Sequence, residues 1–174
     1  MAYTILDCYT DEPAGLGVPP YLGTYPRYIA GYLNEDVHYL TIDDLRLWAK
    51  HDSIIKETKQ SQKTDITTYN LTINYKNIEK ILEETDTLII VLGVHVPGKY
   101  LSAVPGTLKE VIPLIKDIKC KKILTGPAVF GTQLQGGKFF EKSDLSVFDK
   151  VEHEMFNLPY DKVRDYAVDG AKII

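Results

Sequence analysis

The chain has 174 residues, of which 44% are hydrophobic and 25% are charged, and its formal net charge is -4. A chain of this length can bury roughly 70% of its unfolded surface, so its core requires neither disulfides nor a structural metal. The two cysteines exclude a disulfide scaffold and a four-ligand zinc site, and the mildly acidic balance argues against a nucleic-acid surface. We therefore expect one domain over residues 1–174, in a reducing compartment.

The amino terminus does not resemble a secretory signal peptide. It lacks a basic region followed by an apolar stretch and a small-residue cleavage site. No window of the chain approaches the roughly 18 uninterrupted apolar residues of a membrane span. We expect a cytoplasmic protein without a membrane partner.

Two strand-and-helix units are predicted at the start of the chain. Tyr3–Cys8 is a short apolar run typical of a buried strand, and a loop rich in proline and glycine follows over Tyr9–Pro20. Apolar residues at helical spacing predict a helix over Pro26–Leu33. Val37–Ile42 is predicted as a second strand, followed by a helix that includes Leu45–Ala49.

The middle of the chain gives weaker signals. Thr41 and Asp44 form a weak capping pair for the second helix. Lys56–Asp65 is polar and is predicted to be an exposed excursion. Over Tyr69–Tyr75 apolar and polar residues alternate, which predicts a half-buried edge strand. A helix carrying the apolar residues of Ile78–Leu82 should follow.

The second half of the chain repeats the alternation of strand and helix. Thr87–Leu92 is continuous and rich in β-branched residues, as in a parallel strand buried on both faces. Thr107–Glu110 is a capping box that begins a helix, and Lys122–Thr125 is a further strand. Leu145–Phe148 is a candidate fifth strand, and Tyr160–Ala171 reads as helical. The alternation predicts an open, doubly wound, mainly parallel five-stranded α/β sheet with helices on both faces.

In such sheets, ligands bind outside the carboxyl ends of the strands, where the strand order reverses. Three glycine-rich loops leave those ends, over Tyr9–Thr24, Gly93–Thr107 and Gly126–Gly137, and we expect them to meet at one crevice. Their glycines allow the backbone to approach a cofactor closely, although each could also serve only a turn. The candidate cofactor-binding residues are Cys8, Tyr9, Gly15, Gly17, Gly23, Thr24, Gly93, His95, Gly98, Lys99, Gly106, Thr107 and Gly126.

Other sequence motifs limit the kinds of ligand and reaction that we expect of this chain. Neither Gly-x-Gly-x-x-Gly nor the triphosphate loop motif follows a predicted strand, so dinucleotide and triphosphate binding lose support. Of four histidines only His95 falls at a strand end, where it either touches a ligand or packs locally, and no metal site is predicted. Cys8 is favoured as a buried, inert thiol over a reactive thiolate. Two of the carboxylates of Asp7, Asp11 and Glu12 could form a catalytic pair, but these residues are better explained as caps of turns.

Several segments resemble the cobalamin-binding-type domains that precede a radical SAM barrel. Gly15–Leu33, with its Pro-Pro and Leu-Gly pairs, resembles the opening of these domains, and the strand Val37–Asp43 ends in an acidic residue as theirs does. Gly126–Pro127 stands where that family often carries two glycines. Leu6–Pro20 and His95–Glu110 look like an archaeal subfamily of radical SAM proteins. The resemblance implies a Rossmann-like domain that binds cobalamin.

The chain also departs from this family. Cobalamin proteins with a histidine ligand carry Asp-x-His-x-x-Gly after the first strand, whereas here Tyr9 replaces the histidine and Glu12 the glycine. The resemblance therefore implies cobalamin binding without a lower histidine ligand. The radical SAM motif Cys-x-x-x-Cys-x-x-Cys is absent, so a 4Fe-4S cluster and S-adenosylmethionine would belong to a C-terminal catalytic barrel outside this chain.

These observations predict an accessory N-terminal domain of a longer radical SAM protein. It would bind cobalamin or part of a substrate at the carboxyl ends of the strands, with no radical chemistry of its own. Its partner would be the barrel of the same full-length chain, which would be the enzyme. Two alternatives stay open: a stand-alone flavodoxin-like binder of a small molecule, and a structural domain that packs on the barrel.

Overall fold

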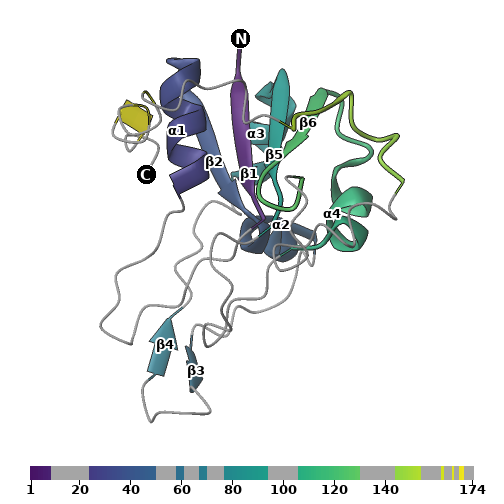
Figure 1. Ribbon diagram of the computed structural model, residues 1–174. Coiled ribbons are helices and arrows are strands. Elements are labelled where there is room, and N and C mark those ends of the chain that lie inside the picture. The colour runs from purple at the N-terminus through teal and green to yellow at the C-terminus, as the bar shows by residue number, and fades with distance from the viewer. Residues whose placement is uncertain are drawn as a thin grey trace.

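The computed structural model describes residues 1–8, 24–49, 58–60, 67–69, 77–93, 106–129 and 144–153, together with residues 162, 166, 169 and 170. Its centre is a five-stranded sheet in the order β2-β1-β5-β6-β7, in which every neighbouring pair is parallel (Figure 1). The strands are β1 (Tyr3–Asp7), β2 (Val37–Thr41), β5 (Thr87–Val91), β6 (Lys121–Thr125) and β7 (Lys150–Val151). The predicted parallel α/β sheet is confirmed.

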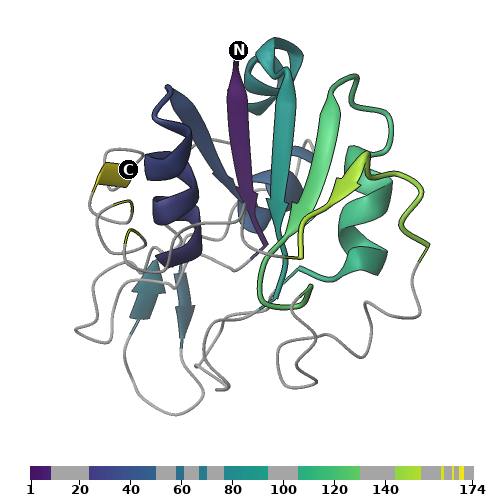
Figure 2. The ribbon, with the colours of Figure 1, turned by 45° about the horizontal axis from the view of Figure 1, so that its top comes forward.

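Helices cover both faces of this sheet, as predicted. On one face lies α1 (Thr24–Leu33), whose Tyr28 and Ile29 pack with alternate residues of the strands. On the other face lie α2 (Ile42–Ala49), α3 (Ile78–Glu84) and α4 (Leu108–Ile115). Figure 2 shows this division, with α1 and α4 on different sides of the strands.

The two central strands, β1 and β5, hold most of the core. All five side chains of β5 are buried. Because neighbouring residues of a strand point to opposite faces, Leu88 and Ile90 pack toward the three helices, whereas Ile89 and Val91 pack toward α1. A strand buried on both faces explains why β5 is apolar throughout, without the alternation of a half-exposed strand.

A small separate sheet lies in the middle of the chain. Of the strand expected over Tyr69–Tyr75, Tyr69 alone is described: it is the last residue of β4 (Thr67–Tyr69), which pairs antiparallel with β3 (Thr58–Gln60) in a two-stranded sheet. β3 falls within Lys56–Asp65, where only an exposed excursion was expected. The threonines of both segments favour strands, but the alternating pattern does not tell which strand they will pair with. Residues 70–76 lie outside the described residues.

The fifth strand of the main sheet lies later than predicted. The segment Leu145–Phe148 forms a turn, in which the Phe148 N–H donates to the Leu145 carbonyl over 3.0 Å. The strand is β7 at Lys150–Val151, and Phe148 is apolar because its side chain is buried in the core. Of the predicted helix Tyr160–Ala171, only residues 162, 166, 169 and 170 are described.

The described C-terminal residues contact α1. A side chain at Gly31 would overlap the backbone of Tyr166, and a side chain at Gly170 would overlap the backbone of Arg27. The rings of Tyr32 and Tyr166 also meet edge-on, with their centroids 5.8 Å apart. Glycine at these two positions therefore allows the C-terminal segment to approach α1 closely.

Within the described residues, no helix combines the length and the apolar character needed to cross a membrane.

Candidate functional site

The strand order reverses between β1 and β5. The chain leaves β1 toward β2 on one side, and β5 continues toward β6 on the other. In parallel sheets a crevice forms outside the carboxyl ends of two such strands. Here these ends are Asp7 and Val91, which are partners in the register of the sheet. We therefore take the edge around Asp7 and Val91 as the candidate site.

Asp7 is held on the α1 side of this edge. Its side chain is buried, with the residue only 2% exposed. Its Oδ2 accepts a hydrogen bond of 2.9 Å from the Tyr39 hydroxyl on β2. A buried carboxylate needs such partners because losing water without them is costly. Asp7 therefore ties β1 to β2 at the edge where both strands end.

Cys8 lies on the opposite side of β1, beneath the three helices. Its thiol is fully buried, and burial raises its pKa well above the ordinary value, with the charges of Asp7 and Glu110 acting in the same direction. Arg46 acts in the opposite direction and is the weakest of these causes. The thiol is therefore protonated at neutral pH, as expected for an inert cysteine rather than a nucleophile.

Gly106 fits closely against this cysteine. Its N–H donates to the Cys8 carbonyl over 2.6 Å. A Cβ at Gly106 would lie 2.9 Å from Cγ1 of Ile42 and 3.3 Å from Cβ of Cys8. The absence of a side chain thus lets the backbone at Gly106 lie directly against the end of β1.

Two further glycines turn the chain at the ends of β5 and β6. Gly93 has φ 102° and Gly126 has φ 109°, a region that side-chain-bearing residues rarely adopt. A Cβ at Gly126 would also lie 2.6 Å from the backbone nitrogen of Leu92. Leu92 in turn donates to the Thr125 carbonyl over 2.8 Å and accepts from the Ala128 N–H over 3.0 Å. Gly126 therefore serves the close packing of the two strand ends.

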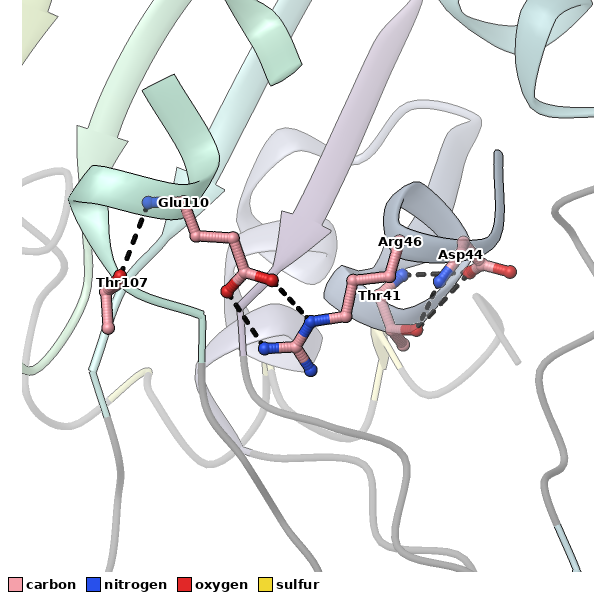
Figure 3. A network of polar contacts seen from close by, with 5 residues as sticks. All are labelled: Thr41, Asp44, Arg46, Thr107 and Glu110. Atoms are coloured by element: carbon pink, nitrogen blue, oxygen red, sulfur yellow. Dashed lines mark hydrogen bonds and ion pairs between the residues drawn. The ribbon is translucent and has the colours of Figure 1, made fainter. Parts of the chain in front are cut away.

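An ion pair joins α2 to α4 beside the end of β1 (Figure 3). Nε of Arg46 lies 2.6 Å from Oε1 of Glu110, and Nη2 lies 2.9 Å from Oε2, so the contact is bidentate. The two side chains are 21% and 34% exposed. Charge-assisted pairs of this geometry are stronger than single contacts. The pair holds the first turn of α4 against α2.

Both helices begin at capping residues that the sequence indicates. At α2 the Thr41 N–H donates to Oδ2 of Asp44 over 2.9 Å, and the Asp44 N–H donates to Oγ1 of Thr41 over 3.4 Å. At α4 the Glu110 N–H donates to Oγ1 of Thr107 over 3.3 Å. The carboxylate of Glu110, however, turns to Arg46 rather than back to its own helix start (Figure 3). The first capping pair is confirmed in full, and the second in its Thr107 half.

The structure brings together five of the predicted site residues at this edge: Cys8, Gly93, Gly106, Thr107 and Gly126. Thr24 is the first residue of α1, and its side chain is not described. The other predicted residues, Tyr9, Gly15, Gly17, Gly23, His95, Gly98 and Lys99, lie outside the described residues. The predicted site as a whole stays a prediction.

Arg46 and Tyr39 also lie at this edge, although the sequence did not indicate them as site residues. Neither belongs to a motif, and both are placed there by the strand order. Arg46 meets Glu110 because α2 and α4 follow the strands on the two sides of β1. This pair could have been predicted only by someone who already knew that β2 and β5 both neighbour β1.

Among the described residues, no cluster of three or more histidine, cysteine, aspartate or glutamate side chains is arranged to hold a metal ion. Of the described histidines, His38 lies on β2 and His153 follows β7. Neither histidine therefore lies at the carboxyl ends of β1 and β5, where the strand order reverses.

Comparison with known proteins finds archaeal relatives that are much longer. The chain is 34% identical to an uncharacterized protein of Methanocaldococcus jannaschii over 197 aligned positions, which cover 98% of this chain and 31% of that protein. It is 29% identical to an uncharacterized protein of Archaeoglobus fulgidus over 175 positions, which cover 99% of this chain and 26% of that protein. No family model and no solved structure matches the chain. The chain thus spans less than a third of these relatives.

Proposed function

We propose that the chain is an accessory domain of a longer protein of the radical SAM type, and that it binds a corrinoid or part of the substrate. The ligand would lie at the carboxyl ends of β1 and β5. Three observations support this: the parallel sheet, the greater length of the archaeal relatives, and the sequence resemblances, in which Gly15–Leu33 resembles cobalamin-binding-type domains and Leu6–Pro20 and His95–Glu110 resemble an archaeal subfamily of radical SAM proteins.

The reversal of strand order between β1 and β5 carries the proposal. Connections that leave two adjacent parallel strands in opposite directions leave an opening between them. The start of α4 lies at the same edge, because Gly106 lies against the end of β1. The β3–β4 hairpin also lies beyond the carboxyl ends of the strands in both views (Figures 1 and 2). A ligand here would contact several chain segments at once.

The described residues fit a corrinoid only in a mode without a protein ligand on cobalt. Cys8 is buried and protonated, and the described histidines are not at the β1/β5 edge. This agrees with the replacement of the family's histidine by Tyr9. A bound corrinoid would supply the cobalt chemistry, whereas this chain would bind and orient it.

In this proposal, Arg46 and Glu110 act as positioning residues. Their ion pair fixes the first turn of α4 relative to α2, and so fixes one wall of the crevice. Gly106 and Gly126 let the backbone segments at the strand ends pack closely enough to form a firm floor. The 4Fe-4S cluster, S-adenosylmethionine and the radical reaction would belong to the remainder of the longer protein.

Retention of hydroxocobalamin tests this proposal. The purified chain is mixed with the corrinoid and passed through a gel-filtration column, and the visible spectrum of the protein peak is recorded. We expect retained corrinoid, with weaker retention by the His95→Ala variant and unchanged retention by His38→Ala, because His38 is an exposed residue of β2.

Absence of retained corrinoid from the folded wild-type chain would reject corrinoid binding. That result would favour the structural alternative, in which the sheet packs on the barrel. The structural alternative has its own support in the internal roles of Cys8, Gly106 and Gly126, which contact protein rather than an open crevice.

A further inference from the structure

The α1 face of the sheet has a hollow at the opposite edge from the candidate ligand site. Its volume is about 750 Å³, and it lies at the amino ends of β1, β5, β6 and β7. Tyr3, Leu33, Ile89 and Ile123 supply apolar side chains to it, and Asp86, Lys121 and Lys150 supply charged ones. The hollow is therefore an apolar surface with a charged rim.

The division of helices between the two faces explains why a hollow exists there. Parallel sheets are ordinarily covered by helices on both faces, because their strands are apolar on both. Three described helices cover one face, whereas α1 is the only described helix on the other. In Figure 2, α1 stands beside β2 and β1, and no described helix stands in front of β5 and β6. Within the part of the chain that the structure describes, no helix therefore covers this half of the face.

The charges of the rim indicate what kind of segment would fit. The Asp86 carboxylate already accepts the Ala2 N–H over 2.8 Å, and Lys150 pairs with Glu152. Lys121 is exposed, and within the described part of the chain no carboxylate forms an ion pair with it. Among the described rim residues, Lys121 thus offers a positive charge to a partner.

We propose that this hollow docks an amphipathic helix from the part of the longer protein that lies outside this chain. Its apolar face would cover Leu33 and Tyr3, and a carboxylate at its border would pair with Lys121. More than two thirds of each archaeal relative lies outside the aligned region, which is enough chain to supply such a segment. The inference rests on the proposed function only in that the chain is part of a longer protein. Because the hollow is at the amino edge, docking leaves the carboxyl edge open for a ligand.

Lysine footprinting tests the docking. The chain is compared alone and in a full-length protein in which it replaces the aligned part of the Methanocaldococcus jannaschii relative. Each is treated with an acetylating reagent, and the modification rate of every lysine is measured. We expect modification of Lys121 to slow by about tenfold or more in the long protein, because a docked helix would cover it. Lys116, exposed at the end of α4 on the other face, should change less than about twofold.

A matched variant separates docking from a general change in the long protein. Leu33→Asp places a charge on the apolar surface and should restore the Lys121 rate to that of the short chain. If circular dichroism shows that this variant is unfolded, Tyr3→Glu replaces it, since Tyr3 also lines the hollow and is only partly buried. Equal Lys121 rates in the short and long proteins would overturn the inference, as would slowing that the folded variant does not reverse.

The two proposals can fail separately. Corrinoid retention is measured on the 174-residue chain and does not involve the hollow. Docking is measured by the reactivity of Lys121, whether or not a corrinoid binds. If sedimentation showed instead that the short chain dimerises and that Lys121 becomes slow on dimerisation, a second copy would be the occupant and the inference would be wrong.

Discussion

The ion pair between Arg46 and Glu110 links α2 to α4. It is bidentate and partly buried, so water screens it less than an exposed pair. We expect a double-mutant cycle with Arg46→Ala and Glu110→Ala, measured by urea unfolding, to give a coupling free energy of about 1 kcal/mol.

The exposed pair Lys80 and Glu84 is the matched control. Its atoms are 3.9 Å apart, one turn apart on α3, and its side chains are 77% and 56% exposed. Its coupling should be below about 0.5 kcal/mol. Equal couplings for the two pairs would show that the Arg46 contact does not hold the helices together.

Cys8 predicts a loss of stability at alkaline pH. Burial raises its pKa in the folded state, so its contribution to stability is complete below the unfolded pKa of roughly 8.5. As the pH rises above that value, the unfolded chain loses the thiol proton while the folded chain keeps it, and stability falls. Between pH 7 and pH 10, we expect Cys8→Ala to lose about 1–2 kcal/mol less than wild type in urea unfolding.

The stability of wild type must be compared with that of Cys8→Ala, because Tyr28 also contributes to the loss of stability at alkaline pH. Burial, and secondarily the charge of Tyr25, raises the pKa of Tyr28 as well, so the wild-type decline has more than one source. Parallel declines in wild type and Cys8→Ala would contradict a buried, protonated thiol at the end of β1.

At the residue scale, the sequence predicts local roles better than contacts. The Thr41 and Asp44 cap, the Thr107 cap and the inert character of Cys8 all follow from residues close in sequence or from residue type. The partnership of Arg46 with Glu110 spans 64 positions, and no local rule links them. The burial of Cys8 beneath Gly106 likewise depends on how Gly106 lies against the end of β1.

At the scale of elements, Gly126 is a position where a single methyl group should lower stability strongly, because its backbone conformation and its surroundings both exclude a side chain. Its φ of 109° strains any other residue, and a Cβ there would crowd the backbone of Leu92. We expect Gly126→Ala to lower the free energy of unfolding by at least about 3 kcal/mol. Gly93→Ala, with φ 102°, should cost about 1–2 kcal/mol from the backbone conformation. Thermal unfolding of both variants checks the difference, and equal costs would mean that the crowding is relieved by small movements.

The strength of the hydrophobic pattern determines which elements could be predicted. β1, β2, β5 and β6 lie within one residue of their predicted bounds at each end, because buried strands have continuous apolar runs. β7 is only two residues long and is half exposed, so the stronger apolar signal of the preceding turn, with Phe148, obscured it. The β3–β4 hairpin is set by pairing between two polar segments, which leaves no hydrophobic periodicity.

On the scale of the whole molecule, the alternation of strands and helices predicts a parallel sheet but not its strand order. The reversal between β1 and β5 depends on which side each helix packs, and several orders satisfy the same local patterns. That reversal places the candidate ligand site at one edge of the sheet. The hollow that we propose as a docking site lies at the other edge, on the face that carries fewer of the described helices. The two edges therefore have different expected partners.

The most direct test of this account is a backbone amide NMR titration of the chain with hydroxocobalamin. A ligand at the β1/β5 reversal should change the chemical shifts of the amides of Gly93, Gly106 and Thr107, which lie at the carboxyl edge of the sheet. Amides at the opposite edge, such as those of Thr87 and Lys121, should not change. Changes centred on Thr87 and Lys121, or none anywhere, would contradict a ligand site at the β1/β5 reversal.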